Sequence, residues 1–189
     1  MFKKMRGFTL IELLIVVAII GILAALLIPN ALAAMQKAKQ KSCMKEIMTI
    51  STGAADYITD HGDFTNATLN GPVANGTAFV NGLSPFYVKS FPINDPWNEP
   101  YQIDTGTTDT LGWLDAASAA TLGGDDFLIA SLGRNNTQGA LTYDSQNPDG
   151  SRYNVGSMGD FDNDLVAWSG NWIIAPSTSL VQAASGGTT

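Results

Sequence analysis

The chain has 189 residues and a formal net charge of −7, but the charge is divided unevenly. Residues 1–50 carry seven basic and two acidic residues, whereas residues 51–189 carry three basic and fifteen acidic residues. The acidic second part argues against nucleic acid as a main partner, because phosphate binding needs clusters of Lys and Arg. One cysteine excludes an intrachain disulfide, and one cysteine with one histidine is too few for most catalytic sets and zinc sites. We therefore expect that the chain is not an enzyme, although a hydrolase that uses two carboxylates stays open.

An apolar run from Phe8 to Ile28 dominates the first part of the chain. As a helix, its 21 residues reach about 30 Å, the thickness of the hydrocarbon core of a bilayer. The basic residues before the run predict a cytoplasmic start and an exported remainder. Glu12 lies inside the run, where an ionised carboxylate is costly unless it is paired. Cleavage between Gly7 and Phe8 would place a new α-amino group about one helical turn from Glu12, so that the two charges neutralise each other.

Two ordinary explanations of the run are a secretory signal peptide and a simple signal anchor. A signal peptide has a candidate small-residue cleavage site at Ala31-Leu32-Ala33. However, the run is longer than a typical signal-peptide core, and neither explanation accounts for Glu12.

An ordered motif leads into the run, Lys4-Met5-Arg6-Gly7-Phe8-Thr9-Leu10-Ile11-Glu12, and Pro29 follows it. This combination resembles the class III signal of type IV pilins and type II secretion pseudopilins. The resemblance implies that a prepilin peptidase cuts after Gly7 and methylates Phe8, and that Glu12 guides each subunit into a helical filament. It also implies a cleaved leader at 1–7, a transmembrane and assembly half-helix at 8–29, an amphipathic half-helix at 30–61 and a periplasmic globular head at 62–189. Pro29 removes one helical hydrogen bond, so we expect a kink or loosening there.

The half-helix at 30–61 has an apolar stripe at helical spacing, which is expected to pack on a sheet: Cys43, Ile47, Ile50, Ala54 and Tyr57. The opposite face holds Lys37, Lys39, Lys41, Lys45 and Glu46, either as a solvated surface or as a contact for anionic lipid or another subunit. Gly62 is a natural C-terminal cap. We interpret Cys43 as a packed apolar residue and His61 as a surface residue, not as a redox thiol and a metal ligand.

Residues 63–100 are rich in Gly, Asn, Thr and Pro, which predicts a loop with short extended pieces. Within them, Asp95-Pro96-Trp97-Asn98-Glu99-Pro100-Tyr101 predicts a turn entering a strand, with Trp97 and Tyr101 holding it on the core. This stretch also resembles the Asp-Pro-Trp-x-x-Pro-Tyr element of the major pseudopilin of type II secretion. Short strands are expected at 126–131, 165–168 and 172–174. Residues 102–124 show no regular pattern, 137–159 is polar and rich in Gly, and 175–189 is expected to be a mobile tail.

Carboxylates alternate in Asp160-Phe161-Asp162-Asn163-Asp164, and such oxygens suit calcium. An EF-hand is excluded, because Leu165 and Asn171 stand where that motif needs Gly and Glu. An acidic turn that binds nothing is the alternative. Together with Ser131-Leu132-Gly133-Arg134-Asn135-Asn136, the segment resembles the C-terminal calcium loop of secretion pseudopilins. The resemblance implies a calcium site formed by the Leu132 carbonyl and the side chains of Asn135, Asp162 and Asp164. Asn135 replaces an Asp of that pattern, and 137–159 is longer than the usual link.

These features predict an α+β fold, in which one long N-terminal helix packs on a small antiparallel β-sheet with a C-terminal acidic loop, as in type IV pilins. The resemblance implies a structural subunit of a type II secretion pseudopilus that helps to export folded proteins. Its expected partners are copies of itself, the prepilin peptidase, the inner-membrane assembly platform, minor pseudopilins and, before assembly, membrane lipid. The expected location is a single pass through the inner membrane with the head in the periplasm. The alternative is a major or minor type IV pilin for attachment, motility or DNA uptake, which shares every feature through residue 60.

Overall fold

The computed structural model describes residues 8–177 and divides the chain into two compact units, residues 1–37 and 38–189. Helix α1 (Leu10–His61) belongs to both units. The predicted leader at 1–7 and residues 178–189 of the predicted tail lie outside the described residues.

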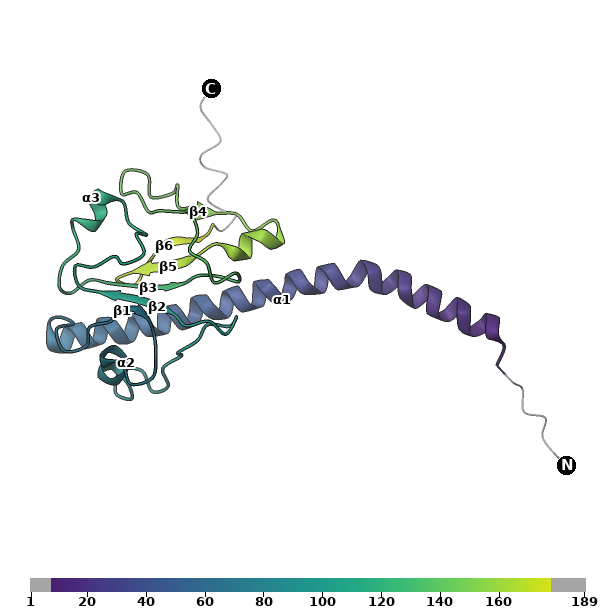
Figure 1. Ribbon diagram of the computed structural model, residues 1–189, viewed down its shortest axis with the longest axis horizontal. Coiled ribbons are helices and arrows are strands. Elements are labelled where there is room, and N and C mark those ends of the chain that lie inside the picture. Colours follow the sequence, from purple (N-terminus) through teal and green to yellow (C-terminus); the bar gives the residue numbers. More distant parts are fainter. Residues whose placement is uncertain (1–7, 178–189) are drawn as a thin grey trace, which may run out of the picture. The chain divides into compact units, whose positions relative to one another are not determined.

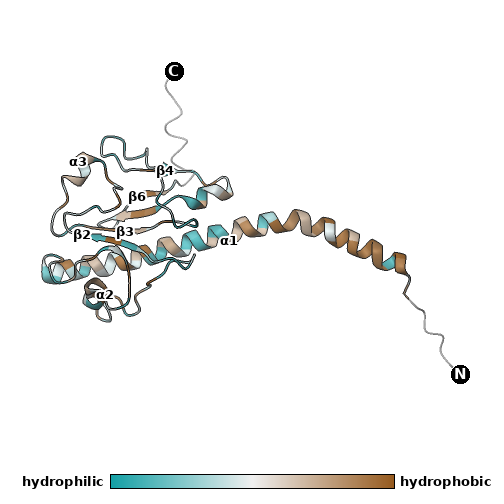
Figure 2. Ribbon diagram, viewed as in Figure 1, coloured by the Kyte–Doolittle hydropathy of each residue, from teal (hydrophilic) through white to brown (hydrophobic). Residues whose placement is uncertain are grey.

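The first unit holds the apolar half of α1. Its large apolar side chains, from Phe8 to Met35, are exposed, and Figure 2 shows this half of the helix as almost continuously hydrophobic. By length and composition, α1 contains the one span in residues 8–177 that is able to cross a membrane. Pro29 lies inside α1 and the helix continues past it, so the predicted loosening does not interrupt the helix. The side-chain amide of Asn30 donates to the carbonyl of Leu26 at 3.4 Å, across the turn that contains the proline.

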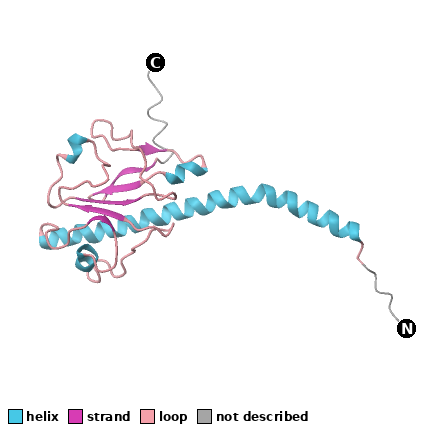
Figure 3. Ribbon diagram, viewed as in Figure 1, coloured by secondary structure: helices cyan, strands magenta, loops and turns pink. Residues whose placement is uncertain are grey.

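The second unit is a head built from the other half of α1 and a sheet (Figures 1 and 3). Its strands are β1 (Asn70–Pro72), β2 (Gln102–Thr105), β3 (Phe127–Ser131), β4 (Arg152–Tyr153), β5 (Leu165–Trp168) and β6 (Asn171–Pro176). The helices α2 (Ala78–Leu83) and α3 (Ala116–Ala119) and the 3-10 helix η1 (Met158–Asp162) lie between strands. The strand order is β1-β2-β3-β5-β6-β4, and neighbours are antiparallel except for the parallel pair β4 and β6. The predicted α+β fold is therefore confirmed, with one parallel pair that was not expected.

The predicted apolar stripe of α1 is buried against one face of this sheet. Cys43, Ile47, Ile50, Ala54 and Tyr57 are all less than 5% exposed. They belong to one core cluster with side chains from three central strands, Ile103, Phe127, Ile129, Leu165 and Ala167. Figure 1 shows this half of α1 running along the sheet.

Successive strand residues point to opposite faces, so the intervening side chains form a second core cluster. Leu128, Ala130 and Val166 pack there with Trp113, which is fully buried. Every residue of β3 is consequently buried, which explains why this strand is continuously apolar from Phe127 to Ala130.

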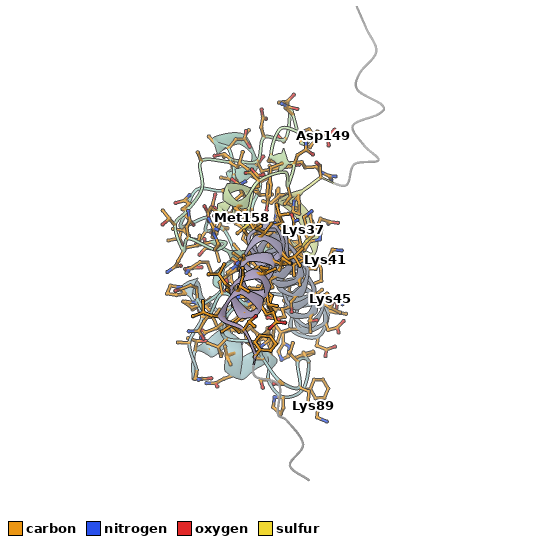
Figure 4. The ribbon with its side chains drawn as sticks, turned by 90° about the vertical axis from the view of Figure 1, so that its right-hand side faces the viewer. Lys37, Lys41, Lys45, Lys89, Asp149 and Met158 are labelled. Carbon is orange, nitrogen blue, oxygen red and sulfur yellow. The ribbon has the colours of Figure 1, made fainter. Side chains whose placement is uncertain are left out.

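The polar side of α1 is narrower than the sequence indicates. Lys37, Lys41 and Lys45 are exposed, and Figure 4 shows the last two on the same side of the helix, but Lys39 and Glu46 are half-buried. The helix ends as predicted. Gly62 has a φ of +87°, a conformation that glycine adopts without strain, and its N–H donates to the Ile58 carbonyl at 2.7 Å.

Two regions that looked irregular contain short elements. In the predicted loop at 63–100, Thr77 caps α2, and its hydroxyl accepts a hydrogen bond from the N–H of Val80 at 3.4 Å. In 102–124, β2 pairs with β3, and Asp115 caps α3 by accepting the N–H of Ser118 at 3.0 Å. The short extended pieces predicted in 63–100 include β1, but the helix α2 was not predicted there. The expectation of no regular pattern in 102–124 is wrong, because contacts with distant residues stabilise elements of only four residues.

Candidate functional site

Glu12 closes the first turn of α1. Its carboxylate accepts hydrogen bonds from the N–H of Thr9 at 2.8 Å and the hydroxyl of Thr9 at 2.6 Å. In return, the Glu12 N–H donates to Thr9 Oγ1 at 3.3 Å. This reciprocal pair is a capping box, which satisfies donors that the start of a helix leaves without partners. The carboxylate is thus hydrogen-bonded to the residue that follows Phe8, and Phe8 itself is 73% exposed. Gly7 lies outside the described residues, so cleavage and the pairing of a new amino group with Glu12 stay predictions.

Asp95 organises the turn at 95–101. Its Oδ1 accepts the N–H groups of Trp97 at 2.9 Å and Glu99 at 3.0 Å, which shapes the turn from within. Its Oδ2 accepts the hydroxyl of Ser131 at 2.6 Å, at the end of β3. Asp95 is only 5% exposed, so one buried carboxylate joins the turn to the strand that leads into the C-terminal loop.

Tyr101 joins the same turn to helix α1. The ring is fully buried, and its hydroxyl donates to Glu46 Oε2 at 2.8 Å and lies 3.7 Å from the sulfur of Cys43. Burial raises the pKa of the Cys43 thiol to about 12. A neutral, enclosed thiol is a poor nucleophile, which agrees with the interpretation of Cys43 as a packing residue.

The loop after β3 packs against the predicted acidic segment. A Cβ atom on Gly133 would lie 2.8 Å from the carbonyl oxygen of Asn163 and 2.9 Å from that of Phe161, so only glycine fits. The N–H of Arg134 donates to the same Phe161 carbonyl at 2.9 Å. Residues 132–134 and 161–163, which are far apart in sequence, are therefore brought together as the resemblance implies.

Within this loop, Asp162 is paired with Arg134. Arg134 Nε lies 2.8 Å from Asp162 Oδ1 and Arg134 Nη2 lies 3.0 Å from Oδ2, a two-point contact between planar groups. The side chains of Arg134 and Asp162 are 34% and 30% exposed. No motif indicates this pair, because the two residues are 28 positions apart, and the role of Arg134 was therefore not predicted.

Asp164 is the most buried carboxylate of the acidic segment, at 1% exposure. Its Oδ2 accepts the indole N–H of Trp113 and the backbone N–H of Gly139, both at 3.0 Å. Its Oδ1 is buried and has no hydrogen-bond partner. Burial raises the pKa of this carboxyl, while the two donors oppose the shift. A buried carboxylate oxygen without a partner is unusual and has the chemistry of a cation ligand.

The other two predicted ligands are the carbonyl of Leu132 and the side chain of Asn135. Leu132 is half-buried, and the side-chain oxygen of Asn135, which is exposed, accepts the N–H of Thr137 at 3.0 Å. Across residues 8–177, no three side chains of His, Cys, Asp or Glu are grouped so as to hold a metal. A calcium ion here would therefore depend on amide and carbonyl oxygens beside Asp162 and Asp164. The free oxygen of Asp164 fits such an ion, whereas Asp162 is occupied by Arg134.

Comparison with known proteins supports the resemblance found in the sequence. The family model of the prokaryotic N-terminal methylation motif matches residues 2–28. Type II secretion system core protein G of Vibrio cholerae is 37% identical over 123 residues, which cover 58% of this chain and 84% of the relative. The protein of the same name in Escherichia coli is 31% identical over 129 residues, 65% of this chain and 88% of the relative. The type IV major pilin protein PilA of Myxococcus xanthus is 44% identical, but over only 64 residues, 32% of this chain and 29% of the pilin. No solved structure gives a significant match to the chain.

The methylation motif and a long helix packed on a mostly antiparallel sheet define a pilin-like protein of the type IV class. Within that class, the chain belongs to the pseudopilin family of type II secretion system core protein G. This family is structural, so the expectation that the chain is not an enzyme is confirmed.

Proposed function

We propose that this chain is a subunit of a type II secretion pseudopilus, cleaved after Gly7, methylated at Phe8 and assembled into a filament that helps to export folded proteins. The observation that carries the proposal is the first half of α1. Its apolar side chains are exposed, and this half of the helix carries a single carboxylate, Glu12, at its start. Such a surface is stable in lipid or inside a bundle of like helices, and not in water. The subunit therefore waits in the inner membrane and moves into a filament of its own copies.

The remaining partners follow from this route. The prepilin peptidase acts on the leader, and an inner-membrane assembly platform and minor pseudopilins start and extend the filament. The acidic head lies in the periplasm, because the basic residues of the leader stay in the cytoplasm.

A type IV pilus subunit is the alternative. The Myxococcus xanthus pilin match favours it but spans only 64 residues, about a third of this chain. The turn at 95–101, held by Asp95 and Tyr101, supports the secretion assignment, since it matches an element of the major secretion pseudopilin. If the chain restored motility or attachment and did not restore secretion, the pilus subunit would be the better assignment.

The test is complementation of a bacterium that has a type II system and lacks its own core protein G. We expect the wild-type chain to restore secretion, and mass spectrometry to show loss of residues 1–7 and gain of one methyl group. Glu12→Ala should still be inserted and cleaved but should yield neither filaments nor secretion. Asp149→Ala is the matched control, because Asp149 is an exposed carboxylate of the head. Full secretion by Glu12→Ala would refute the assembly role.

We also propose that the loop at 131–136 and the segment at 160–164 bind calcium through the Leu132 carbonyl, Asn135, Asp162 and Asp164. The free, buried oxygen of Asp164 supports this proposal. Calcium would supply positive charge at this carboxylate and hold the loop after β3 against the segment before β5. Because binding to the folded state alone stabilises it, calcium should raise the melting temperature of the full-length protein in detergent. Asp164→Asn should abolish the increase and Asp149→Asn should not. An equal increase in both variants would place the ion elsewhere.

A further inference from the structure

The strongest ion pair in the described part of the head lies inside the proposed calcium loop. Arg134 and Asp162 meet through two short contacts, of 2.8 and 3.0 Å, and each side chain is about one-third exposed. The other ion pair in residues 8–177, Arg152 with Asp149, is a single contact of 3.7 Å between more exposed side chains. The exposed pair of Arg152 and Asp149 therefore serves as an internal comparison for the two-point pair of Arg134 and Asp162.

The position of Arg134 is fixed by the backbone as well as by its charge. Gly133, the residue before it, packs on the carbonyls of Phe161 and Asn163, and the N–H of Arg134 itself bonds to Phe161. The guanidinium is therefore presented to Asp162 by the same backbone contacts that close the loop. In the sequence, Arg134 immediately precedes Asn135, which is one of the proposed calcium ligands.

We propose that Arg134 is a built-in counter-cation of this loop, and that the guanidinium and a divalent cation compete for Asp162. The inference rests on the proposed calcium site. Both oxygens of Asp162 already accept a hydrogen bond from Arg134. A calcium ion on the same carboxylate would lie within a few ångströms of the guanidinium, and two positive charges at that distance repel each other. Calcium binding must therefore displace Arg134 or lose Asp162 as a ligand.

Two consequences follow. The loop is closed without metal, because Arg134 neutralises Asp162 and joins the residues after β3 to the end of η1. Calcium affinity is also lower than the oxygen ligands alone would give, because the ion has to replace an existing partner. Removal of the guanidinium should weaken the metal-free protein and tighten calcium binding at the same time.

The experiment titrates calcium into the full-length protein in a non-ionic detergent, starting from a chelator-treated sample. Thermal melting and tryptophan fluorescence are the two readouts; the second reports on Trp113, whose indole N–H bonds to Asp164. The variants are Arg134→Gln and Arg134→Lys, with Arg152→Gln as the matched control. In chelator, Arg134→Gln should melt below wild type. Its half-saturating calcium concentration should be about tenfold lower, the equivalent of about 1.4 kcal/mol.

Arg134→Lys keeps the charge without the two-point contact and should fall between wild type and Arg134→Gln. If Arg134→Gln folds only when calcium is present, the metal has taken over the role of the guanidinium, which supports the proposal. An unchanged or higher half-saturating concentration in both Arg134 variants overturns competition while the calcium site itself stands. The absence of any calcium response in all variants overturns the site, and the competition with it.

Discussion

Replacement of Gly53 by alanine should weaken the head, although alanine is the better helix former. Gly53 lies in the buried half of α1, and a Cβ atom there would come 2.3 Å from Val88 Cγ2 and 3.5 Å from the carbonyl oxygen of Tyr87. Carbon atoms in contact stay about 3.5–4.0 Å apart, so the Val88 methyl group has to move by about 1.2 Å or more. Val88 is only 4% exposed, which leaves little free space to receive it.

The magnitude follows from two opposing terms. Insertion of a methyl group into a packed core costs about 1–3 kcal/mol. Replacement of glycine by alanine inside a helix gains about 0.5–1 kcal/mol. The difference spans about 0–2.5 kcal/mol. Because a buried methyl group has to move, we expect the upper part of this range, a loss of about 1–2 kcal/mol of unfolding free energy, which for a head of this size lowers the melting temperature by about 2–8 °C.

The assay is urea unfolding of the full-length protein in detergent, followed by tryptophan fluorescence. Gly21→Ala is the control, because Gly21 lies in the same helix and has nothing within 4 Å of the added Cβ. In a Val88→Ala background the clash disappears, so Gly53→Ala should become neutral or stabilising. A single variant Gly53→Ala as stable as wild type would show that the contact between α1 and Val88 is looser than the structure indicates.

Cys43 should resist alkylation at pH 8.5 in the folded protein and react fully after unfolding, as mass spectrometry after iodoacetamide treatment would show. Because its pKa rises from 9.0 to about 12 on folding, its contribution to stability is complete below pH 9 and is lost as the pH rises from 9 towards 12, at up to about 1.4 kcal/mol per pH unit. Cys43→Ala should flatten this part of a pH series of urea melts, and an unchanged slope would contradict the assignment. Asp95→Ala should cost about 2–4 kcal/mol in urea unfolding, because it removes the acceptor of two turn N–H groups and the buried hydroxyl of Ser131. Asp149→Ala should change the unfolding free energy by no more than about 0.5 kcal/mol. Equal losses in the two variants would show that the hydrogen bonds of Asp95 add no more stability than a surface carboxylate does.

The long helix and the central strands were predictable because their signals are local and periodic. The spacing from Cys43 to Tyr57 marks the buried face of α1, and the apolar run at 126–131 marks β3. By contrast, β2 has one apolar residue, Ile103, among four, and it is a strand because it pairs with β3. Pairing with a distant segment leaves no trace in the sequence of a short polar stretch.

The candidate site shows the same division. The segments that form the C-terminal loop were found from ordered motifs, and the structure brings residues 132–134 and 161–163 together. The partners of individual carboxylates were not found. Arg134 stands 28 positions from Asp162, and Trp113 stands 51 positions from Asp164, so these bonds depend on how the loops fold back. Sequence therefore predicted that these two segments form one loop region, and not what their carboxylates bind.

The two edge strands of the sheet also affect whether neighbouring subunits can pair through their sheets. At one edge, β1 has three residues and ends in Pro72, and at the other, β4 has only two. A sheet whose open edge is long and flat invites a neighbouring chain to add a strand, whereas short edges and proline discourage it. In the described part of the head, β1 offers three residues for such pairing and β4 offers two, while β4 covers only Ala175 and Pro176 of β6. In the proposed filament, a neighbouring head could therefore pair with β1 or β4 over three residues at most, which disfavours the merging of sheets through these two strands.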